Sequence, residues 1–582
     1  MTNAGAPSLG MSSARKNPTT KTSKSSARRE APREAPREIE LKLVVDPPTL
    51  ARIRKAGALS RLPMVLGSAR STVHNLTSLY WDTQNHALAR TGMALRVRRD
   101  GGRVVQALKA ADSLGRSGGL VANRAEDEAM RPAADAFAPP DLSLVADEQL
   151  RARAAAAIGN DDLVPIFESA ISRVARVLRS SGNGSFEAAL DLGEVRLPPS
   201  EDGTPGLRTP ICEIELEHIS GPVETLFDVA RALADKYPIK VGTVSKVERG
   251  FALAARRSGL DHPRKGPSVK AGRSPVEPGM TTHTAYGALL AHCARQMAAN
   301  QSAILIDQNS SGIHQMRVAM RRLRSVHAAF KPVRPPSGTT EVIEQVKRMF
   351  RPLGTARDLD IFCTETMPTL QKEAAGVGPS LVPLAAAAQE LRREAWARAI
   401  RIVDDRTFTH MLLELGHLSA TVSAPDDGSA TSPAATKKDA SLAQFAVSRL
   451  DRRYRQVLTQ ARDLETMDDE ARHDLRKRLK SLRYEAAFFA PLWPRNQVKA
   501  FMKPLKRLQD EFGAINDAAT AASVARLAAD RIGGDRAHEA AGFVGGWYAA
   551  RADLAFRQVV EIWPFFEELP RFWETDPHID PN

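Results

Sequence analysis

The sequence predicts an α+β protein of two domains, in which an antiparallel β domain precedes an all-helical domain. From Glu38 to about residue 255, apolar and polar residues alternate in short segments, as they do in half-buried strands. From about 282 to 568 the apolar period becomes helical, in long stretches rich in Ala, Leu and Arg. Residues 257–281 lie between these regions, and their Gly, Pro and Lys content is typical of a linker.

Charge and length set the class of protein. The chain has 582 residues, too many for one core, and carries a formal net charge of +14. Such an excess favours a polyanionic partner, namely nucleic acid, an anionic membrane or polyphosphate, although a generally basic surface has the same composition. No apolar run is long enough to span a bilayer, so the chain is not expected to be a membrane protein.

The two ends and the cysteines complete the outline. Residues 1–36 are basic and rich in small polar residues, which predicts a disordered tail, although an organelle transit peptide has a similar composition. Residues 569–582 are expected to form a C-terminal tail, and residues 421–440 a loop within the helical half. Three widely spaced cysteines without a CxxC pair argue against disulfides and against a cysteine zinc site, and favour a reducing compartment such as the cytoplasm.

The predicted strands of the first domain place charges at every second position, so that each strand has one charged face. Glu38, Glu40 and Lys42 alternate with Ile39, Leu41 and Leu43. Charges of one parity recur in four further groups: Arg96 and Arg98; Arg124, Glu126 and Glu128; Glu187 and Asp191; Glu213, Glu215 and Glu217. An ordinary solvated sheet face would mix Lys, Thr, Ser and Gln, and glutamates at spacing two repel one another. The pattern therefore favours a closed barrel with a charged lumen, whose apolar side is covered by helices such as one expected at 223–235.

Such a lumen combines two kinds of ligand-binding group. Arg and Lys donate charge-assisted hydrogen bonds to phosphate oxygens. Clustered Asp and Glu bind hard divalent cations such as Mg²⁺ or Mn²⁺. Together they suit phosphoryl transfer, in which positioning and charge neutralisation dominate catalysis.

The ordered series of motifs resembles the CYTH family of triphosphate tunnel metalloenzymes. The resemblance begins with Glu38-Ile-Glu40-Leu-Lys42, which is similar to the family's ExExK signature, and ends with Ser245-Lys246 and Arg249-Gly250. Between them lie Tyr80-Trp-Asp82-Thr, Leu95-Arg96-Val-Arg98, Leu190-Asp191-Leu-Gly193-Glu194 and Glu213-Ile-Glu215-Leu-Glu217. The resemblance implies an eight-stranded antiparallel tunnel with flanking helices over residues 37–256, acting as a divalent-metal-dependent inorganic triphosphatase.

The resemblance also implies roles for individual residues. Those that would bind the triphosphate are Lys42, Arg96, Arg98, Lys109, Arg124 and Lys246. Those that would hold Mg²⁺ or Mn²⁺ are Glu38, Glu40, Glu126, Asp191, Glu213 and Glu215, with Glu128, Glu187 and Glu217 sharing their face. Glu38, Glu40 and Lys42 are expected to be catalytic.

The helical half contains an internal duplication. His314, Arg317, Arg321 and Arg324 are spaced 0, 3, 7 and 10, and His473, Arg476, Lys480 and Arg483 repeat this spacing 159 residues later. Gly354 and Gly513, and likewise Lys347 and Lys506, share the same offset. Agreement at so many fixed positions indicates a repeat.

Each repeated segment predicts a helix with one apolar and one cationic stripe. Met316, Met320 and Leu323 lie opposite the first cationic stripe, and Leu475, Leu479 and Leu482 lie opposite the second. An ordinary exposed helix face mixes charge signs, whereas these stripes are unmixed and a linear polyanion would neutralise both. The two histidines are expected either to add charge at mildly acidic pH or to remain neutral. Asp358, Asp360, Asp510 and Asp517 either orient the basic groups or are structural.

The repeat resembles the CHAD family of conserved-histidine helical domains, which are often fused to CYTH. The matching segments are His314-Gln-Met-Arg317 to Arg324, Leu353-Gly354-Thr-Ala-Arg357-Asp358, His473-Asp-Leu-Arg476 to Tyr484, and Leu508 to Asp517. The resemblance implies two pseudo-symmetric four-helix bundles over residues 282–568 that bind inorganic polyphosphate. The polyphosphate-binding residues would be His314, Arg317, Arg321, Arg324, Lys347, His473, Arg476, Lys480, Arg483 and Lys506. Asn516 replaces Arg357 of the first copy, so the copies need not bind equally.

Several functions fit these features. An inorganic triphosphatase whose helical domain recruits longer phosphate chains uses both halves. A class IV-type adenylyl cyclase would use the same barrel, although no nucleoside-recognition signal is evident. A non-catalytic polyphosphate-binding protein that targets polyphosphate granules would need no complete acid set. An aromatic content of 5% argues against single-stranded nucleic acid in the basic groove.

Overall fold

The computed structural model describes ten ranges of the chain. They are residues 37–55, 57–111, 119–135, 137–181, 184–199, 203–257, 268–306, 308–333, 335–423 and 441–577. The predicted N-terminal tail over 1–36, residues 258–267 of the predicted linker, residues 424–440 of the predicted loop and the last five residues lie outside the described ranges.

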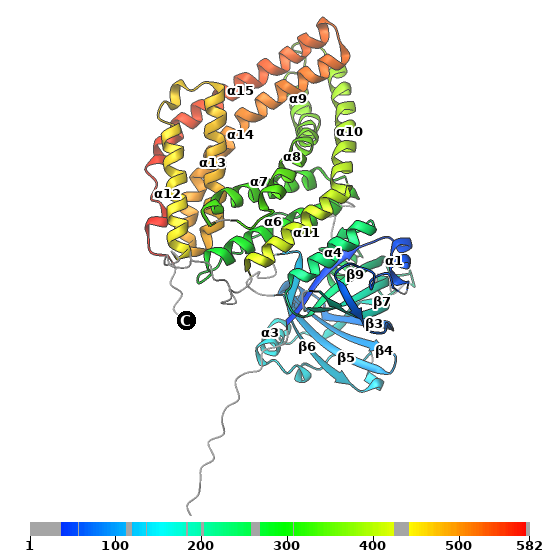
Figure 1. Ribbon diagram of the computed structural model, residues 1–582. Coiled ribbons are helices and arrows are strands. Elements are labelled where there is room, and N and C mark those ends of the chain that lie inside the picture. Colours follow the sequence, from blue (N-terminus) through cyan, green and yellow to red (C-terminus); the bar gives the residue numbers. More distant parts are fainter. Residues whose placement is uncertain are drawn as a thin grey trace, which may run out of the picture.

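The first domain is a closed antiparallel barrel (Figure 1). Its eight strands are β1 (Arg37–Val44), β3 (Thr72–Thr83), β4 (Met93–Asp100), β5 (Arg103–Ala111), β6 (Val121–Arg131), β7 (Leu163–Ser180), β8 (Ser185–Arg196) and β9 (Arg208–Ser220). They are ordered β1-β6-β5-β4-β3-β7-β8-β9, and pairing of β9 with β1 closes the barrel. Two short strands lie outside this ring: β2 (Val65–Ser68) pairs with β7, and β10 (Lys240–Val241) pairs with β1. The predicted eight-stranded antiparallel barrel is confirmed.

The register of the strands separates charged from apolar side chains. Lys42 of β1 pairs with Glu215 of β9, and the next lumen-facing pair is Glu40 with Glu217. The intervening residues Leu41 and Leu216 are fully buried on the outer side, where they pack in one core with α4 (Glu224–Lys236). The charged face therefore lines the interior, and the predicted covering helix lies within one residue of its expected place.

Four more helices flank the barrel. They are α1 (Pro47–Arg54), α2 (Ala87–Arg90), α3 (Glu148–Ile158) and α5 (Lys246–Arg257). The fully buried Asp82 accepts hydrogen bonds from the backbone N–H of Leu88 (2.8 Å) and Ala89 (2.9 Å), so it caps α2. α5 begins at Lys246, which explains how this side chain reaches the lumen without belonging to a strand.

The second domain is entirely helical. Its helices are α6 (Thr282–Leu305), α7 (Ser310–Phe330), α8 (Thr339–Ile361), α9 (Met367–Glu373), α10 (Val382–Asp404), α11 (Arg406–Ser423), α12 (Leu442–Gln460), α13 (Asp469–Phe489), α14 (Arg495–Ile532) and α15 (Asp535–Glu567). A π-helical turn over Phe362–Thr366 joins α8 to α9 without a break. No helix within the described ranges has the length and apolar character needed to cross a membrane.

The duplication predicted from spacing is visible in the helix boundaries. α7 and α13 each have 21 residues and begin 159 positions apart, at Ser310 and Asp469. The helical stretch from Thr339 to Glu373 corresponds in the same way to the part of α14 that ends at Ile532. α6 corresponds to α12 and α10 to α15, which completes two four-helix units. α11 has no counterpart among the described residues of the second copy.

α11 joins the two domains. It lies against α4 of the barrel (Figure 1), and Gly416 leaves no room for a Cβ, which would stand 2.1 Å from the ring of Phe227. The Oγ1 hydroxyl of Thr409 donates to the carbonyl of Ile239 at 3.2 Å, and Lys240 pairs with Asp404 at 2.9 Å. One continuous hydrophobic core includes residues of both domains, so side-chain packing fixes their relative placement.

Candidate functional site

Charged side chains converge on a cavity of about 260 Å³ inside the barrel. The charged lining residues are Glu38, Glu40, Lys42, Arg96, Arg98, Lys109, Arg124, Glu126, Glu128, Arg173, Glu187, Asp191, Glu215, Glu217 and Lys246. They come from seven of the eight strands and from α5, and β3 adds Ser78 and Tyr80. The barrel thus brings together all the residues predicted for its site except Glu213, which lies behind the lining in contact with Lys42 and Lys246.

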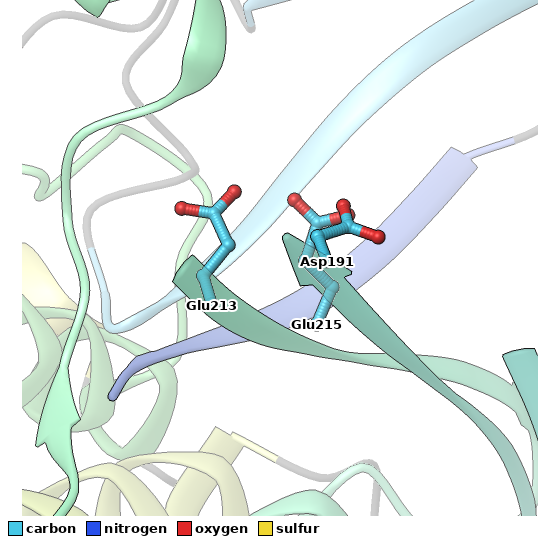
Figure 2. A group of neighbouring side chains, drawn as sticks. All are labelled: Asp191, Glu213 and Glu215. Atoms are coloured by element: carbon cyan, nitrogen blue, oxygen red, sulfur yellow. The ribbon is translucent and has the colours of Figure 1, made fainter. Parts of the chain in front are cut away.

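A buried acidic cluster lies at one side of this cavity. Figure 2 shows the carboxylates of Asp191, Glu213 and Glu215, which offer oxygen atoms within 4.8 Å of one another. The Nζ of Lys246 lies 2.8 Å from Asp191, 2.7 Å from Glu213 and 2.8 Å from Glu215. The Nζ of Lys42 lies 2.6 Å from Glu215 and 3.1 Å from Glu213. Two ammonium groups therefore connect three carboxylates.

Arg173 completes the acidic cluster and was missed by sequence reasoning. Its Nε and Nη2 donate to the two oxygens of Asp191, both at 2.7 Å, and Nη2 also contacts Glu215 at 2.5 Å. The signal in the sequence was weak, because the lumen-facing neighbours of Arg173 on β7 are Ser169 and Ile171 rather than charged residues. With Arg173, and with Arg249 at 3.3 Å from Glu213, three carboxylates face four cations.

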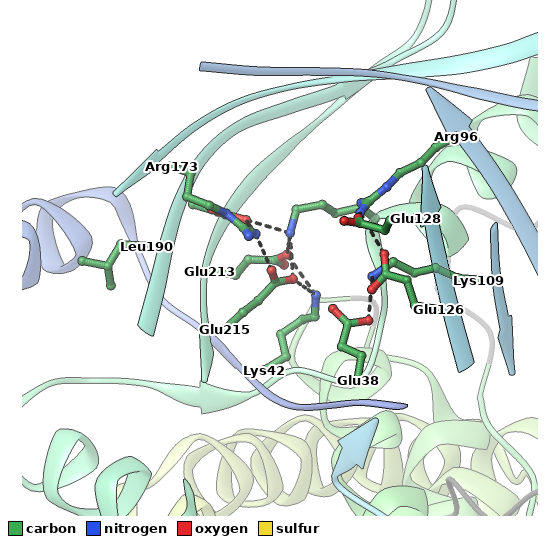
Figure 3. A network of polar contacts seen from close by, with 12 residues as sticks. Glu38, Lys42, Arg96, Lys109, Glu126, Glu128, Arg173, Leu190, Glu213 and Glu215 are labelled. Atoms are coloured by element: carbon green, nitrogen blue, oxygen red, sulfur yellow. Dashed lines mark hydrogen bonds and ion pairs between the residues drawn. The ribbon is translucent and has the colours of Figure 1, made fainter. Parts of the chain in front are cut away.

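A second set of ion pairs forms the opposite wall of the cavity (Figure 3). Lys109 of β5 contacts Glu38 at 2.6 Å and Glu126 at 2.9 Å. Arg96 contacts Glu126 at 3.2 Å. Glu128 is shared by Arg96 at 3.4 Å and Arg98 at 3.2 Å. The cations predicted to bind phosphate are therefore held in place by the carboxylates predicted to bind metal.

Three glutamates form a row without counter-cations. Glu40 pairs with Glu217 across β1 and β9, and Glu217 pairs with Glu187 across β9 and β8. Among the described residues, no Lys or Arg nitrogen forms an ion pair with any of the three. Burial raises the pKa of Glu40, and burial together with Glu38 and Glu187 raises the pKa of Glu217 to about 7. Like charges opposite one another destabilise a sheet, so this row would gain stability from a cation.

The two acidic groups differ in their electrostatics. Burial alone would raise the pKa of Glu215, but Lys246, Lys42 and Arg173 hold it well below its ordinary value. Glu215 is thus ionised and neutralised by protein cations, whereas the row of Glu40, Glu187 and Glu217 forms no ion pair within the described residues, and at Glu40 burial outweighs the attraction of Lys42 and Lys109. Both groups offer only carboxylate oxygens, the donor set that suits Mg²⁺ or Mn²⁺. The residues present therefore fit a divalent metal.

The cationic stripes of the helical domain face each other across the two copies. Arg321 of α7 lies close to α13. Burial is the main cause that lowers the pKa of Arg476 and of Lys480, and the charge of Arg321 lowers both further. Lys480 in turn adds to the effect of burial and three arginines in lowering the pKa of His314 to about 4. The two stripes thus share one electrostatic environment, and the ring of His314 is uncharged at neutral pH.

The cations of these stripes are incompletely satisfied. The Nε atoms of Arg321, Arg357, Arg476 and Arg483 are buried and have no hydrogen-bond partner within the described part of the chain. Burial and the neighbouring Arg476, Arg321 and Arg483 lower the pKa of Lys480 to about 7, although Asp517 opposes the shift. Buried guanidinium and ammonium groups without acceptors are costly. An anion at this place would supply the missing acceptors.

The two copies hold their stripes differently. The Cζ of Arg317 lies 4.2 Å from the ring centre of Phe350, and its Nη1 donates to the Phe350 carbonyl at 2.9 Å. Arg317 can take this position because Gly354 has no side chain. A Cβ at Gly354 would lie 2.3 Å from Nη1 of Arg317. In the second copy Gln509 replaces Phe350, and Gly513 faces open space.

The remaining predicted residues lie at the margins. Lys347 pairs with Glu344 at 2.6 Å and Lys506 with Asp510 at 2.6 Å, and within the described residues neither lysine forms an ion pair with the opposite copy. Asp360 is fully buried and accepts from Arg392 at 2.6 Å and from Trp396 at 2.8 Å, so its role is structural. Asp358 and Asp517 lie between the two copies. Burial is the main cause that raises the pKa of each, and the charge of Asp517 raises the pKa of Asp358 further.

Comparison with known proteins finds one matching family for the barrel and another for the helical domain. Residues 36–251 match the CYTH domain, and residues 288–526 match the CHAD domain. The chain is 27% identical over 226 residues to an inorganic triphosphatase of Haemophilus influenzae. That match covers 38% of this chain and 55% of the relative, so the chain spans about half the length of the curated protein it matches.

Two solved structures resemble separate parts of the chain. The CHAD domain from the plant Ricinus communis is 22% identical, with a TM-score of 0.44, over 55% of this chain and 99% of that one. A putative adenylyl cyclase from Hippeastrum, described as having a dominant triphosphatase activity, is 24% identical, with a TM-score of 0.26, over 38% of this chain and 96% of that one.

Proposed function

Because this chain belongs to the proteins that join a CYTH domain to a CHAD domain, we propose that its barrel is a metal-dependent inorganic triphosphatase and that its helical domain binds inorganic polyphosphate. The proposed division assigns residues 37–256 to hydrolysis, 257–281 to a linker, 282–568 to polyphosphate binding, and 1–36 and 569–582 to tails. The observation that carries the proposal is the cavity of about 260 Å³, which is lined by cations and carboxylates from seven of the eight strands and from α5.

The cations of the cavity provide the binding site for the phosphate chain. Arg96, Arg98 and Lys109 line the cavity from β4 and β5, and Lys42 and Lys246 line it from β1 and α5. Arg124 lines the same cavity and has no ion pair with a described carboxylate. Each of the paired cations is now held by a carboxylate, and phosphate oxygens form the same charge-assisted hydrogen bonds. A triphosphate enters by replacing carboxylates as the acceptors of these groups.

The carboxylates that the triphosphate displaces then hold the metal. We assign Mg²⁺ or Mn²⁺ to Glu38, Glu40, Glu126, Asp191, Glu213 and Glu215, with Glu187 and Glu217 as further ligands because their row lacks a counter-cation. When bound, the metal neutralises phosphate charge and lowers the pKa of water near it. In this exchange phosphate oxygens would replace the carboxylates as partners of the cations, and the metal would become the partner of the released acids.

The side chains of the chain itself perform the remaining steps. Arg173 holds Asp191 and Glu215 in fixed positions through three short contacts, so it is a positioning residue. Glu38 and Glu40 offer carboxylate oxygens that orient the attacking water and accept its proton. Lys42 stabilises the charge that develops on the leaving phosphate, because its Nζ already lies within 3.1 Å of the carboxylates of Glu213 and Glu215, which carry the same charge.

A phosphate-release panel tests the proposed enzyme. The purified protein is given tripolyphosphate, ATP, thiamine triphosphate or long-chain polyphosphate, each with Mg²⁺ or Mn²⁺, and products are also assayed for cyclic AMP. Release of phosphate from tripolyphosphate at the highest kcat/KM is expected. Absence of release from every substrate would refute the enzyme, and cyclic AMP as the main product would favour the cyclase.

Polyphosphate binding by the helical domain rests on the facing stripes. The buried Nε atoms of Arg321 and Arg476, one from each copy, have no acceptor among the described residues, and a linear polyanion would supply it. A chain-like ligand suits two stripes that run along two helices better than a compact anion does. Through this binding the protein would associate with polyphosphate granules in the cytoplasm, which co-sedimentation with isolated granules would test.

A further inference from the structure

A second arginine-rich cavity lies in the helical domain, between α12, α13 and the end of α7. Its volume is about 650 Å³. Its polar lining includes four arginines and two glutamines, namely Arg449, Arg452, Arg455, Arg478, Gln456 and Gln460. No Asp or Glu lines it, and Phe445 and Pro332 form an apolar part of its wall.

The protein neutralises the arginines of this cavity only in part. Neither Arg452 nor Arg455, both exposed, forms an ion pair with a described carboxylate. Arg449 is 8% exposed and donates from Nη2 to the carbonyl of Ala328 at 3.3 Å, but its Nε has no acceptor. The nearby buried Glu485 is held instead by Arg453, at 2.5 Å from Nε. Glu485 also attracts Arg449 and Arg452, but it is one carboxylate outside the lining against four lining arginines, so the cavity carries a net positive charge.

The duplication shows that the fold does not require these residues. The first-copy equivalents of Arg449, Arg452 and Arg478 are Leu290, Cys293 and Ala319, and all three are fully buried. In that copy α11 packs on α6, and Asn300 ties the Val269 backbone to the helix through hydrogen bonds of 3.0 and 2.8 Å. The described second copy has no helix equivalent to α11. The same positions are therefore core in one copy and an open cationic cavity in the other.

The cavity is distinct from the groove between the stripes. Arg478 lies two residues from both Arg476 and Lys480 on α13, so its side chain leaves a different face of the helix. Arg476 and Lys480 point toward the first copy, whereas the Nε of Arg478 donates to Gln460 of α12 at 3.2 Å. On α12, Arg449, Arg452 and Arg455 follow at intervals of three residues, which places their Cα atoms over about 9 Å of helix.

We propose that this cavity is a second anion site, which binds a chain of two or more phosphates. Guanidinium groups pair bidentately with phosphate oxygens, and four of them spread over two helices suit an extended anion better than a single phosphate. Gln456 and Gln460 add neutral donors. The phosphate chain can be that of an inorganic oligophosphate or of a nucleoside triphosphate, whose base would lie on the Phe445 and Pro332 side.

Calorimetry of the full-length protein in EDTA tests this site apart from hydrolysis. An Arg321→Gln/Arg476→Gln variant, which weakens the groove, is titrated with tripolyphosphate and separately with ATP. Adding Arg452→Gln/Arg455→Gln is expected to lower the remaining affinity at least tenfold. Adding Arg393→Gln/Arg398→Gln instead, which removes two exposed arginines of α10, should change it less than twofold.

The same two variants show which part of the ligand the cavity recognises and whether the ligand binds at α12. Equal affinity for both ligands identifies the phosphate chain as the recognised group, and tighter ATP binding adds the nucleoside. Hydrogen exchange should show that either ligand protects amides of 442–460 in the protein with intact α12 and not in the Arg452→Gln/Arg455→Gln variant. Unchanged affinity in that variant, or no protection of α12 by either ligand, would overturn the proposal even if tripolyphosphate is hydrolysed normally.

Discussion

The barrel and the helical groove both gather cations, but they satisfy them in opposite ways. In the barrel, Lys42, Lys109, Arg96 and Arg173 each contact a carboxylate at 3.2 Å or less. In the groove, neither Arg321 nor Arg476 forms an ion pair with a described carboxylate, and the buried Nε of each has no hydrogen-bond partner there. The cations of the barrel are paired with carboxylates of the protein, whereas the groove carries an excess of positive charge.

This difference determines how each site can bind phosphate. An anion that enters the barrel must displace carboxylates, and the displaced carboxylates need a cation of their own. An anion that reaches the groove meets cations that lack acceptors, so it binds without a second ion. The barrel should therefore require metal together with phosphate, and the groove should require phosphate alone.

The largest expected effect is a loss of hydrolysis in the barrel without a loss of polyphosphate binding in the groove. Glu213→Gln/Glu215→Gln removes two carboxylates that contact Lys42 and Lys246, and should lower kcat/KM for tripolyphosphate about 100-fold or more. Polyphosphate affinity, measured by calorimetry, should change less than twofold. Glu168→Gln/Glu194→Gln makes the same chemical change on the outer face of β7 and β8 and serves as the control. Full activity of the lumen variant would refute the assigned acids.

The next largest effect is a loss of polyphosphate binding in the groove without a loss of hydrolysis in the barrel. Arg321→Gln/Arg476→Gln removes one unpartnered guanidinium from each copy, and each should contribute about a tenfold loss in polyphosphate affinity. The dependence of affinity on salt should also become shallower. Tripolyphosphate turnover should stay within twofold. If turnover and affinity fell together, the two domains would share one site.

A smaller effect uses the titration of Lys480. Burial and neighbouring arginines lower its pKa to about 7 in the free protein, so above pH 7 this side chain loses its charge. A bound polyanion favours the charged form, so binding takes up protons near pH 7 and weakens several-fold as the pH rises through that value. Calorimetry in buffers of different ionisation enthalpy measures this uptake. Lys480→Arg should abolish it, and equal uptake by that variant would exclude Lys480 as the source.

The smallest effect compares two glycines at equivalent positions. Gly354→Ala places a Cβ against Nη1 of Arg317, whereas Gly513→Ala meets no atom within 4 Å. Gly513→Ala should raise the free energy of unfolding by about 0.5–1 kcal/mol, as alanine does inside a helix. Gly354→Ala should gain less, because Arg317 must move, and should weaken polyphosphate binding slightly. Equal results in urea denaturation and calorimetry would show that the copies hold their arginines alike.

Much of the fold follows from spacing in the sequence. The alternation around Glu38, Glu40 and Lys42 predicted a charged interior, and the 159-residue offset predicted α7 and α13 with their boundaries in step. Both predictions depend on local periodicity, which the chain carries without reference to its tertiary structure.

The features that the sequence did not predict depend on contacts between distant segments. Arg173 stands alone as a charge on the lumen face of β7, so only closure of the barrel brings it to Asp191. α11 lacks a repeat equivalent, and its docking on α4 depends on the close approach of Gly416 to Phe227. Asp360 resembles its acidic neighbours in sequence, but burial against Arg392 and Trp396 makes it structural. The assigned metal and polyphosphate ligands stay predictions.

The most direct test of the central claim is calorimetric titration of tripolyphosphate and of long-chain polyphosphate into the same protein, with Mg²⁺ and with EDTA. A tripolyphosphate analogue with methylene groups in place of the bridging oxygens, which the barrel cannot hydrolyse, replaces tripolyphosphate in every titration with Mg²⁺. In the wild-type protein, long-chain polyphosphate should bind with similar affinity in both conditions. Arg321→Gln/Arg476→Gln/Arg452→Gln/Arg455→Gln removes the helical sites, and this variant should bind tripolyphosphate only when Mg²⁺ is present. Metal-independent binding of tripolyphosphate by that variant would contradict the exchange of ion pairs on which the account of the barrel depends.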